Sequence, residues 1–144
     1  MADTIHRCYI FSAEQENFLR SKRYKIDRME CFLSLVDRVQ KESTLVEISN
    51  NRKVELHCGQ FLANDVELSH LWHLDRKTCS KLMKQMAELG LFTVTKVAEL
   101  SVYTMHVLSG WYVNGTFIKN GFYHRPQAPN SPSNCPIPTA NTPL

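Results

Sequence analysis

The sequence predicts an α+β fold whose central part is a pair of helices followed by a β-hairpin. Two helix-capping residues stand close together, Asn64 before one apolar-periodic segment and Asp75 before the next. The second segment ends at Gly90, a residue type that readily adopts the left-handed conformation of a helix C-terminus. Apolar and polar residues then alternate over 92–97 and 102–108, as in a hairpin. This order of elements is that of a winged helix-turn-helix.

The chain length fits one domain with a short tail. We assign residues 1–125 to the winged helix domain, with the helix-turn-helix at 64–90 and the wing at 91–109. Residues 126–144 contain all six prolines of the chain, mixed with Ser, Asn, Thr and Ala. Such a composition buries too little apolar surface to fold alone, so we expect a flexible C-terminal tail.

The N-terminal part carries its own structural signals. Ser12 begins a capping-box pattern and predicts a short helix, which a basic run over 20–25 follows. Apolar residues at helical spacing predict a second helix over 28–41. Two alternating segments, 44–49 and 54–58, predict a β-hairpin with a turn between them. The N-terminal part is therefore expected to be helical, with one hairpin before the helix pair.

The second helix of the pair is predicted to be amphipathic in a way that suits DNA. At about 100° per residue, its buried face holds Cys79, Leu82, Met83 and Met86, and its opposite face holds three lysines. Ammonium groups on such a face can bind phosphates or guanine, and Gln can pair with adenine. A solvated lysine face is the competing interpretation. The candidate DNA contacts on this helix are Arg76, Lys77, Thr78, Ser80, Lys81, Lys84 and Gln85.

Two further basic features are weaker candidates. The predicted wing carries Lys96 as its only basic residue and Glu99 near its tip, so the wing is either structural or contacts the DNA backbone through Lys96. The run after the first helix is a candidate phosphate patch, and an exposed linker explains it equally well. That patch comprises Arg20, Lys22, Arg23 and Lys25.

Three local motifs resemble a known winged-helix family. Gly59-Gln60-Phe61 precedes the helix pair, Trp72 ends its first helix, and Leu89-Gly90-Leu91 closes the second. The pattern is similar to helix-turn-helix proteins of bacterial plasmids, phages and conjugative elements, including the N-terminal domains of replication-initiation and DnaD-like primosome proteins. The resemblance implies double-stranded DNA as the partner. It also implies a role in transcription or replication control of a bacterial or mobile genetic element.

Composition excludes several other classes of protein. The 17 Lys and Arg residues against 14 Asp and Glu permit nucleic-acid binding without requiring it. The sequence has no apolar run long enough for a membrane span and no signal-peptide pattern, and its five scattered cysteines are typical of reduced cytoplasmic thiols. His70 and His73 lack a third ligand at metal-site spacing. We therefore expect a cytoplasmic protein with no catalytic site, metal, cofactor or small-molecule substrate.

Two alternatives remain open at this stage. Winged helices also serve as protein-interaction modules without DNA binding, and the near-neutral charge of residues 64–109 is compatible with that role. The aromatic-rich segment 111–123 either adds a strand or short helix to the core or forms a partner surface. Helix-turn-helix proteins often dimerise to contact two half-sites, so a homodimer is a candidate assembly.

Overall fold

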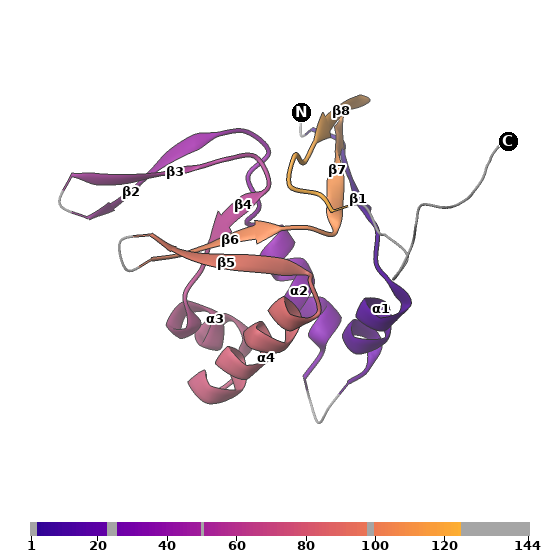
Figure 1. The fold of residues 1–144 in the computed structure, drawn as a ribbon, viewed down its shortest axis with the longest axis vertical. Coiled ribbons are helices and arrows are strands. Elements are labelled where there is room, and N and C mark those ends of the chain that lie inside the picture. The colour runs from indigo at the N-terminus through magenta and orange to yellow at the C-terminus, as the bar shows by residue number, and fades with distance from the viewer. Residues whose placement is uncertain (1–2, 23–25, 50, 98–99, 125–144) are drawn as a thin grey trace, which may run out of the picture.

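The computed structural model describes residues 3–22, 26–49, 51–97 and 100–124 and shows a mixed α+β fold (Figure 1). The helices in these ranges are α1 (Ala13–Arg20), α2 (Arg28–Val36), α3 (Asp65–Trp72) and α4 (Arg76–Glu88). The strands are β1 (Ile5–Tyr9), β2 (Thr44–Ser49), β3 (Arg52–Leu56), β4 (Gln60–Leu62), β5 (Phe92–Val97), β6 (Leu100–Met105), β7 (Leu108–Val113) and β8 (Thr116–Lys119). The expected α+β class is confirmed, and the predicted tail over 126–144 lies outside the described residues.

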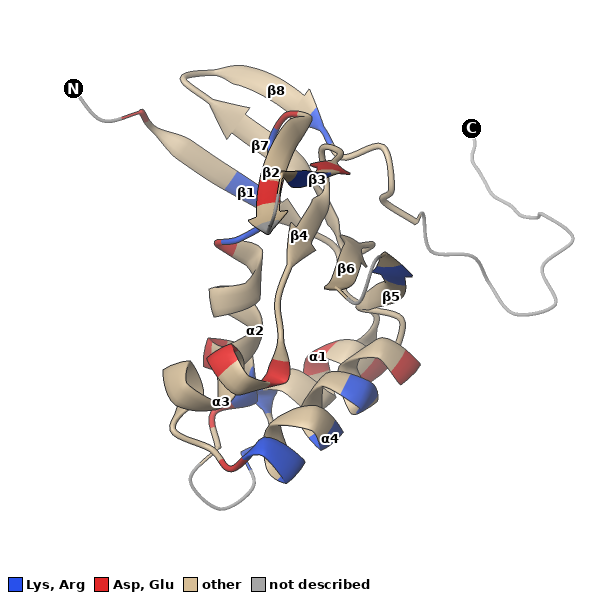
Figure 2. Ribbon diagram, turned by 90° about the vertical axis from the view of Figure 1, so that its left-hand side faces the viewer, with Lys and Arg blue, Asp and Glu red and all other residues tan. Residues whose placement is uncertain are grey.

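The strands form three small antiparallel sheets. Their orders are β1-β7-β8, β2-β3 and β4-β6-β5. In Figure 1 the helices occupy the lower part of the molecule, and the hairpin β5–β6 lies between them and the hairpin β2–β3. Both hairpins project toward the left-hand side of Figure 1, and this side faces the viewer in Figure 2.

The main core lies between the helices and one face of the β4-β6-β5 sheet. Phe61, Phe92 and Tyr103 form an aromatic cluster on this face, with ring centroids 5.0–6.2 Å apart. Phe32 from α2 and Trp111 from β7 are fully buried in the same core. The opposite face of the sheet carries Val102, which packs in a second, smaller cluster with Val54 and Leu56 of β3. Burial of both faces of β6 fixes this strand in place between the helices and the other hairpin, whereas β5 is exposed after Phe92.

The local signals for helix starts are confirmed. Ser12 Oγ accepts a hydrogen bond from Gln15 N at 3.1 Å, and Gln15 Oε1 accepts one from Ser12 N at 2.8 Å, which completes the capping box. The caps of α2 and α3 each use one side-chain bond: Asp27 Oδ1 accepts from Glu30 N at 3.1 Å, and Asn64 Oδ1 accepts from Glu67 N at 2.8 Å. Capping needs only side chains close in sequence, so it can be recognised without the fold.

The predicted end of the second helix is wrong. α2 ends at Val36 and not near Lys41. The cause is a tertiary contact, because Gln40 N donates to Gln60 O at 2.9 Å and Gln40 O accepts from Gly59 N at 2.8 Å. This pairing draws the chain out of the helix while Val39 remains buried, which explains why the apolar spacing continues past the helix.

The predicted strand over 102–108 is also interrupted. It divides into β6 and β7 around His106, whose backbone N–H donates to Leu91 O at 3.1 Å. The fully buried Asn120 bridges the break by donating to Met105 O at 3.0 Å and Leu108 O at 2.8 Å. The segment 111–123 contains the end of β7 and all of β8. The pairing of β7 with β1 was not predicted from sequence.

Candidate nucleic-acid interface

A short, hydrogen-bonded turn connects α3 to the exposed helix α4. His73 ends α3 in the left-handed conformation, with φ +57°, and Leu74 N donates to Ser69 O at 3.0 Å. Asp75 then begins α4, because its Oδ1 accepts a 2.7 Å hydrogen bond from Thr78 N. The turn between the helices therefore consists of the three residues 73–75.

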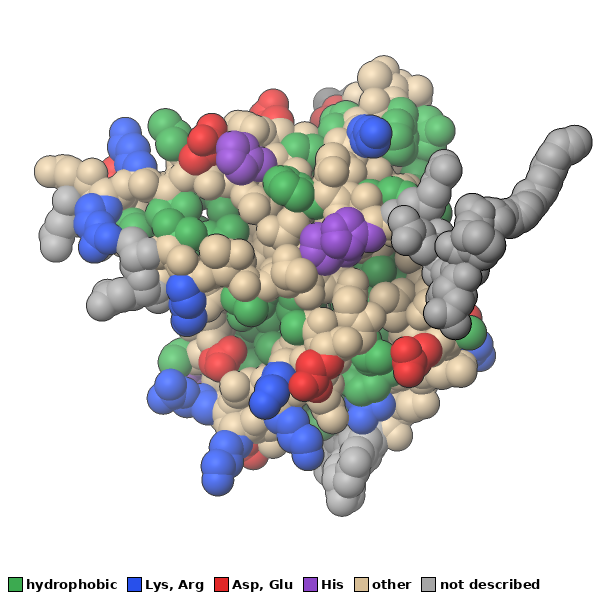
Figure 3. Space-filling view, in the orientation of Figure 1, with side chains coloured by type: hydrophobic (Ala, Val, Ile, Leu, Met, Phe, Trp, Pro, Cys, Tyr) green, Lys and Arg blue, Asp and Glu red, His purple; other side chains and the backbone are tan. Residues whose placement is uncertain are grey.

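Helix α4 has the two faces predicted from its sequence. The four residues predicted to be buried are at most 5% exposed, and they are Cys79, Leu82, Met83 and Met86. Five of the candidate DNA contacts on this helix are exposed: Arg76, Lys77, Ser80, Lys81 and Lys84. Thr78 and Gln85 are half-buried at the flanks. Figure 2 shows Lys and Arg positions along α4, and Figure 3 shows Lys and Arg side chains on the lower part of the molecule, with Asp and Glu side chains among them.

The charges of this helix face are not neutralised by neighbouring acids. Among the described residues, no ion pair includes Arg76 or a lysine of α4. Hydrogen bonds from the backbone N–H and the hydroxyl of Thr78, helped by the charge of Lys77, hold the pKa of Asp75 below its usual range. Asp75 therefore remains ionised as a helix cap, while the first turn of α4 contains no acid.

A groove separates the N-terminus of α4 from the hairpin β5–β6. Its volume is about 540 Å³, and its lining includes the cations Arg76 of α4, Lys96 of β5 and Arg38, which follows α2, and the acids Asp65 and Glu67 of α3. Lys96 Nζ donates to Ser101 Oγ at 2.9 Å, so this cation is held by a neutral partner. Arg76 and Lys96 were both predicted as DNA contacts from separate segments, and the fold places them on the same groove.

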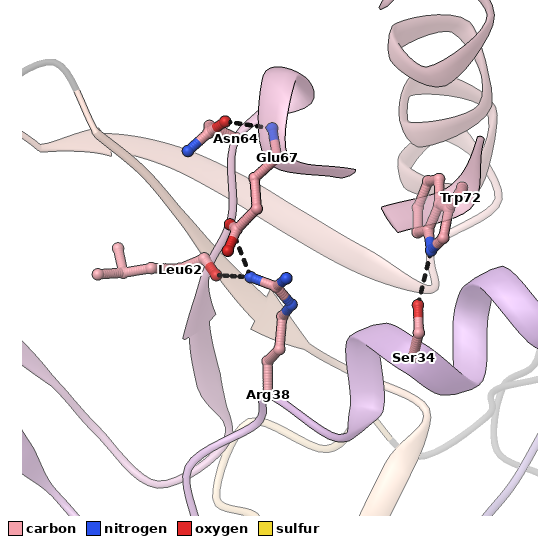
Figure 4. A network of polar contacts seen from close by, with 6 residues as sticks. All are labelled: Ser34, Arg38, Leu62, Asn64, Glu67 and Trp72. Atoms are coloured by element: carbon pink, nitrogen blue, oxygen red, sulfur yellow. Dashed lines mark hydrogen bonds and ion pairs between the residues drawn. The ribbon is translucent and has the colours of Figure 1, made fainter. Parts of the chain in front are cut away.

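Arg38 was not predicted as part of this surface. Its Nη1 binds Glu67 Oε1 at 2.9 Å and lies 3.5 Å from Leu62 O, and the Asn64 side chain caps the same α3 N-terminus (Figure 4). Glu67 offsets the charge of Arg38, so Arg76 and Lys96 are the more available cations of the groove. Nothing in the local sequence around Arg38 indicates that it faces a groove formed by elements later in the chain.

The candidate phosphate patch before α2 is only partly described. Arg20 is the exposed last residue of α1, and Lys22 lies 3.6 Å from Asp27 Oδ2, which partly offsets its charge. Arg23 and Lys25 lie outside the described residues. Helix α1 contacts the C-terminal end of α4, where Gln15 Nε2 donates a 2.8 Å hydrogen bond to Leu89 O. Arg76 lies at the other end of α4. The patch remains a prediction.

Other site chemistries have little support in the described residues. Within them, no group of three or more His, Cys, Asp or Glu side chains is placed to hold a metal ion. The four described cysteines are free thiols, and burial raises the pKa of Cys31 and Cys79 to about 11, which makes them poor nucleophiles at neutral pH. The helices of the described ranges are all too short or too polar to cross a membrane.

No protein-family model, curated protein or solved structure matches this chain. The surface is therefore interpreted from its own geometry and charge. The chain is a mixed α+β protein that presents a cationic helix, without ion pairs to other described residues, beside a groove that a β-hairpin flanks.

Proposed function

We propose that this chain is a DNA-binding protein of the winged helix-turn-helix type. In this proposal α3 and α4 are the helix-turn-helix, β5–β6 is the wing, and α4 enters the major groove of double-stranded DNA. The observation that carries the proposal is the outer face of α4, where Lys77, Lys81 and Lys84 are exposed and free of ion pairs with described acids.

The first turn of α4 adds a second argument. Cations at a helix N-terminus oppose the helix dipole, which costs a few tenths of a kcal/mol or more. Arg76 and Lys77 nevertheless occupy this turn, and no acid follows Asp75 there. A phosphate bound at that N-terminus reverses the sign of the effect, because it interacts favourably with the dipole and with both cations. The resemblance of the 59–91 motifs extends the proposal to transcription or replication control of a bacterial or mobile genetic element.

The test is the salt dependence of duplex binding. The variant Lys77→Ala/Lys81→Ala/Lys84→Ala is compared with wild type by fluorescence anisotropy on a labelled duplex over a range of salt concentrations. Each lost phosphate contact makes the negative slope of log K against log salt shallower by about 0.9, so we expect its magnitude to fall by up to about three. The control variant Lys41→Ala/Lys119→Ala removes cations outside α4 and is expected to keep the wild-type slope. A triple variant with an unchanged slope contradicts the assignment.

One observation favours a protein partner as a second candidate. Tyr112 and Phe117 are 44% and 43% exposed and lie with ring centroids 4.9 Å apart on the β1-β7-β8 sheet, although Trp111 beside them is core. Exposed paired aromatics are enriched at protein interfaces. If this face binds a second copy of the chain, light scattering detects a dimer, and Phe117→Ser converts it to a monomer.

A further inference from the structure

The hairpin β2–β3 lies on the same side of the molecule as the hairpin β5–β6. Val54 and Leu56 of β3 pack on Val102 of β6, so the two hairpins are joined through a shared apolar cluster. Figure 1 shows both hairpins projecting in the same direction, and Figure 2 shows Lys or Arg positions on β3, β5 and α4. The position of β2–β3 is thus set by packing and is not that of an independent loop.

The tip of β2–β3 carries two adjacent cations. β3 begins at Arg52, directly after Asn51, a turn residue in the left-handed conformation with φ +65°. This turn is shorter than the 50–53 turn expected from sequence, so Arg52 and Lys53 stand on the strand and are held by its pairing with β2. Both side chains are exposed, and neither forms an ion pair with another described residue.

The acids near these cations do not neutralise them. Glu47 is the register partner of Lys53 on β2, but the two side chains are not within ion-pair distance. The Glu55 carboxylate lies 3.9 Å from His57 Nε2, on the side away from the tip. The sequence joining β5 to β6, in contrast, contains Glu99 and no cation. Each hairpin has a net charge of zero over its two strands and turn, but the cations of β2–β3 are concentrated at its tip, which makes that tip the better suited of the two for a polyanion.

Grooves that contain exposed cations flank β5–β6 on both of its faces. On one face is the groove that Arg76 and Lys96 line. On the other face a groove of about 320 Å³ separates β3 from β5, and the polar residues of its lining include Lys53, His57 and Thr95, together with the acid Glu55. Lys53, His57 and Thr95 donate hydrogen bonds suited to phosphate oxygens.

We propose that β2–β3 is a second DNA arm, which binds the phosphate backbone beside the segment occupied by α4 through Arg52 and Lys53. The inference rests on the proposed function, because it places this arm on the same duplex. It assigns to β2–β3 the backbone contacts that the acidic tip of β5–β6 is poorly suited to make. The partner chemistry is the sugar–phosphate backbone of duplex DNA, bound without base selectivity.

The experiment compares two charge-matched double variants on a mixed-sequence duplex of about three helical turns, or roughly 30 base pairs. Arg52→Ala/Lys53→Ala removes the tip cations, and Lys41→Ala/Lys119→Ala removes two cations elsewhere. Anisotropy titrations at several salt concentrations give the affinity and the salt slope for each. We expect the magnitude of the salt slope of the tip variant to be smaller than that of the control by up to about two. We expect Arg52→Glu/Lys53→Glu to bind more weakly than Arg52→Ala/Lys53→Ala.

The outcomes separate this inference from the proposed function. Tip variants that retain the slope and affinity of the control overturn the second arm, even if the α4 variant loses binding. A third outcome is that the tip variants reduce the magnitude of the salt slope and the α4 variant leaves it unchanged. This result supports phosphate binding by β2–β3 and overturns the role of α4. A wild-type protein that binds no duplex overturns both proposals. Thermal melts of each variant establish that exposed tip substitutions leave the fold intact.

Discussion

The indole Nε1 of Trp72 donates a 2.8 Å hydrogen bond to Ser34 Oγ and joins the end of α3 to α2 (Figure 4). Ser34 Oγ in turn donates to Cys31 O at 2.6 Å, so the hydroxyl serves as both acceptor and donor. The bond lies at the C-terminal end of α3, just before the turn that orients α4. It therefore connects the position of the exposed helix to the helical core.

We expect Ser34→Ala to destabilise the fold by about 1–2 kcal/mol, because it leaves the half-buried Trp72 N–H without its partner. Urea unfolding followed by Trp fluorescence measures the change. Ser80→Ala, an exposed change on α4, is the control and is expected to alter stability by less than about 0.5 kcal/mol. Equal effects of the two substitutions would show that the Trp72–Ser34 bond contributes little.

Gly59 is expected to tolerate no side chain. Its φ is +99°, and a Cβ there lies 2.0 Å from Oδ1 of the buried Asn120. Asn120 cannot withdraw without breaking its bonds to Met105 O and Leu108 O. Gly59→Ala should therefore lower the unfolding free energy by at least about 2 kcal/mol, as measured by denaturant unfolding. Gly121→Ala, where a Cβ meets open space, is the matched control and should be nearly neutral.

His106 is expected to make stability depend on pH on the acid side of neutrality. It is 6% exposed, its Nδ1 lies 2.8 Å from Phe122 O, and its Nε2 lies 3.0 Å from Thr93 Oγ1. Because a carbonyl only accepts, Nδ1 donates and the neutral ring accepts from Thr93. Burial lowers the pKa of His106, and the hydrogen bond to Phe122 O opposes this shift. The charge of His124, whose ring is stacked on that of His106 with centroids 3.9 Å apart, also lowers the pKa.

The sign of the pH effect follows from this lowered pKa. Above about pH 6.5, the ordinary pKa of histidine, the ring is neutral in both folded and unfolded chains and its contribution is complete. As the pH falls below that value, the unfolded chain takes up the proton first, so stability declines until the folded ring also protonates. Urea midpoints at about pH 7.5 and about pH 5.5 measure the loss. His106→Gln should show a smaller difference between the two, and an undiminished difference would assign the effect to other groups.

Asp75→Asn is expected to strengthen DNA binding if α4 is the recognition helix. Asn is as good a helix cap as Asp, so the bond to Thr78 N and the start of α4 are retained. The substitution removes the single acid at the end of a helix that carries Arg76 and Lys77. We expect an affinity gain of about twofold at low salt that diminishes as salt screens the charges. Asp75→Ala is the control for loss of the helix cap, because it removes both the charge and the capping hydrogen bond. We expect it to fray the start of α4, which circular dichroism detects as lower helix content.

Several features of this chain could be predicted from sequence because their causes are local. The caps at Ser12, Asn64 and Asp75 each act on a backbone N–H three residues away. The buried and exposed faces of α4 follow from the 3.6-residue period of the helix alone. Both hairpins were predicted for the same reason, since their strands are separated by short turns.

The sheet β1-β7-β8, the early end of α2 and the convergence of Arg38, Arg76 and Lys96 on one groove depended on tertiary structure. β1 gives little sequence signal because residues 5–7 are exposed, and its partner β7 lies about a hundred residues further along the chain. By itself, then, the sequence determined which residues cap each helix and which side of α4 faces solvent. Which cations share a surface was decided only by packing between segments far apart in the chain, whose pairing leaves no periodic signal in either segment.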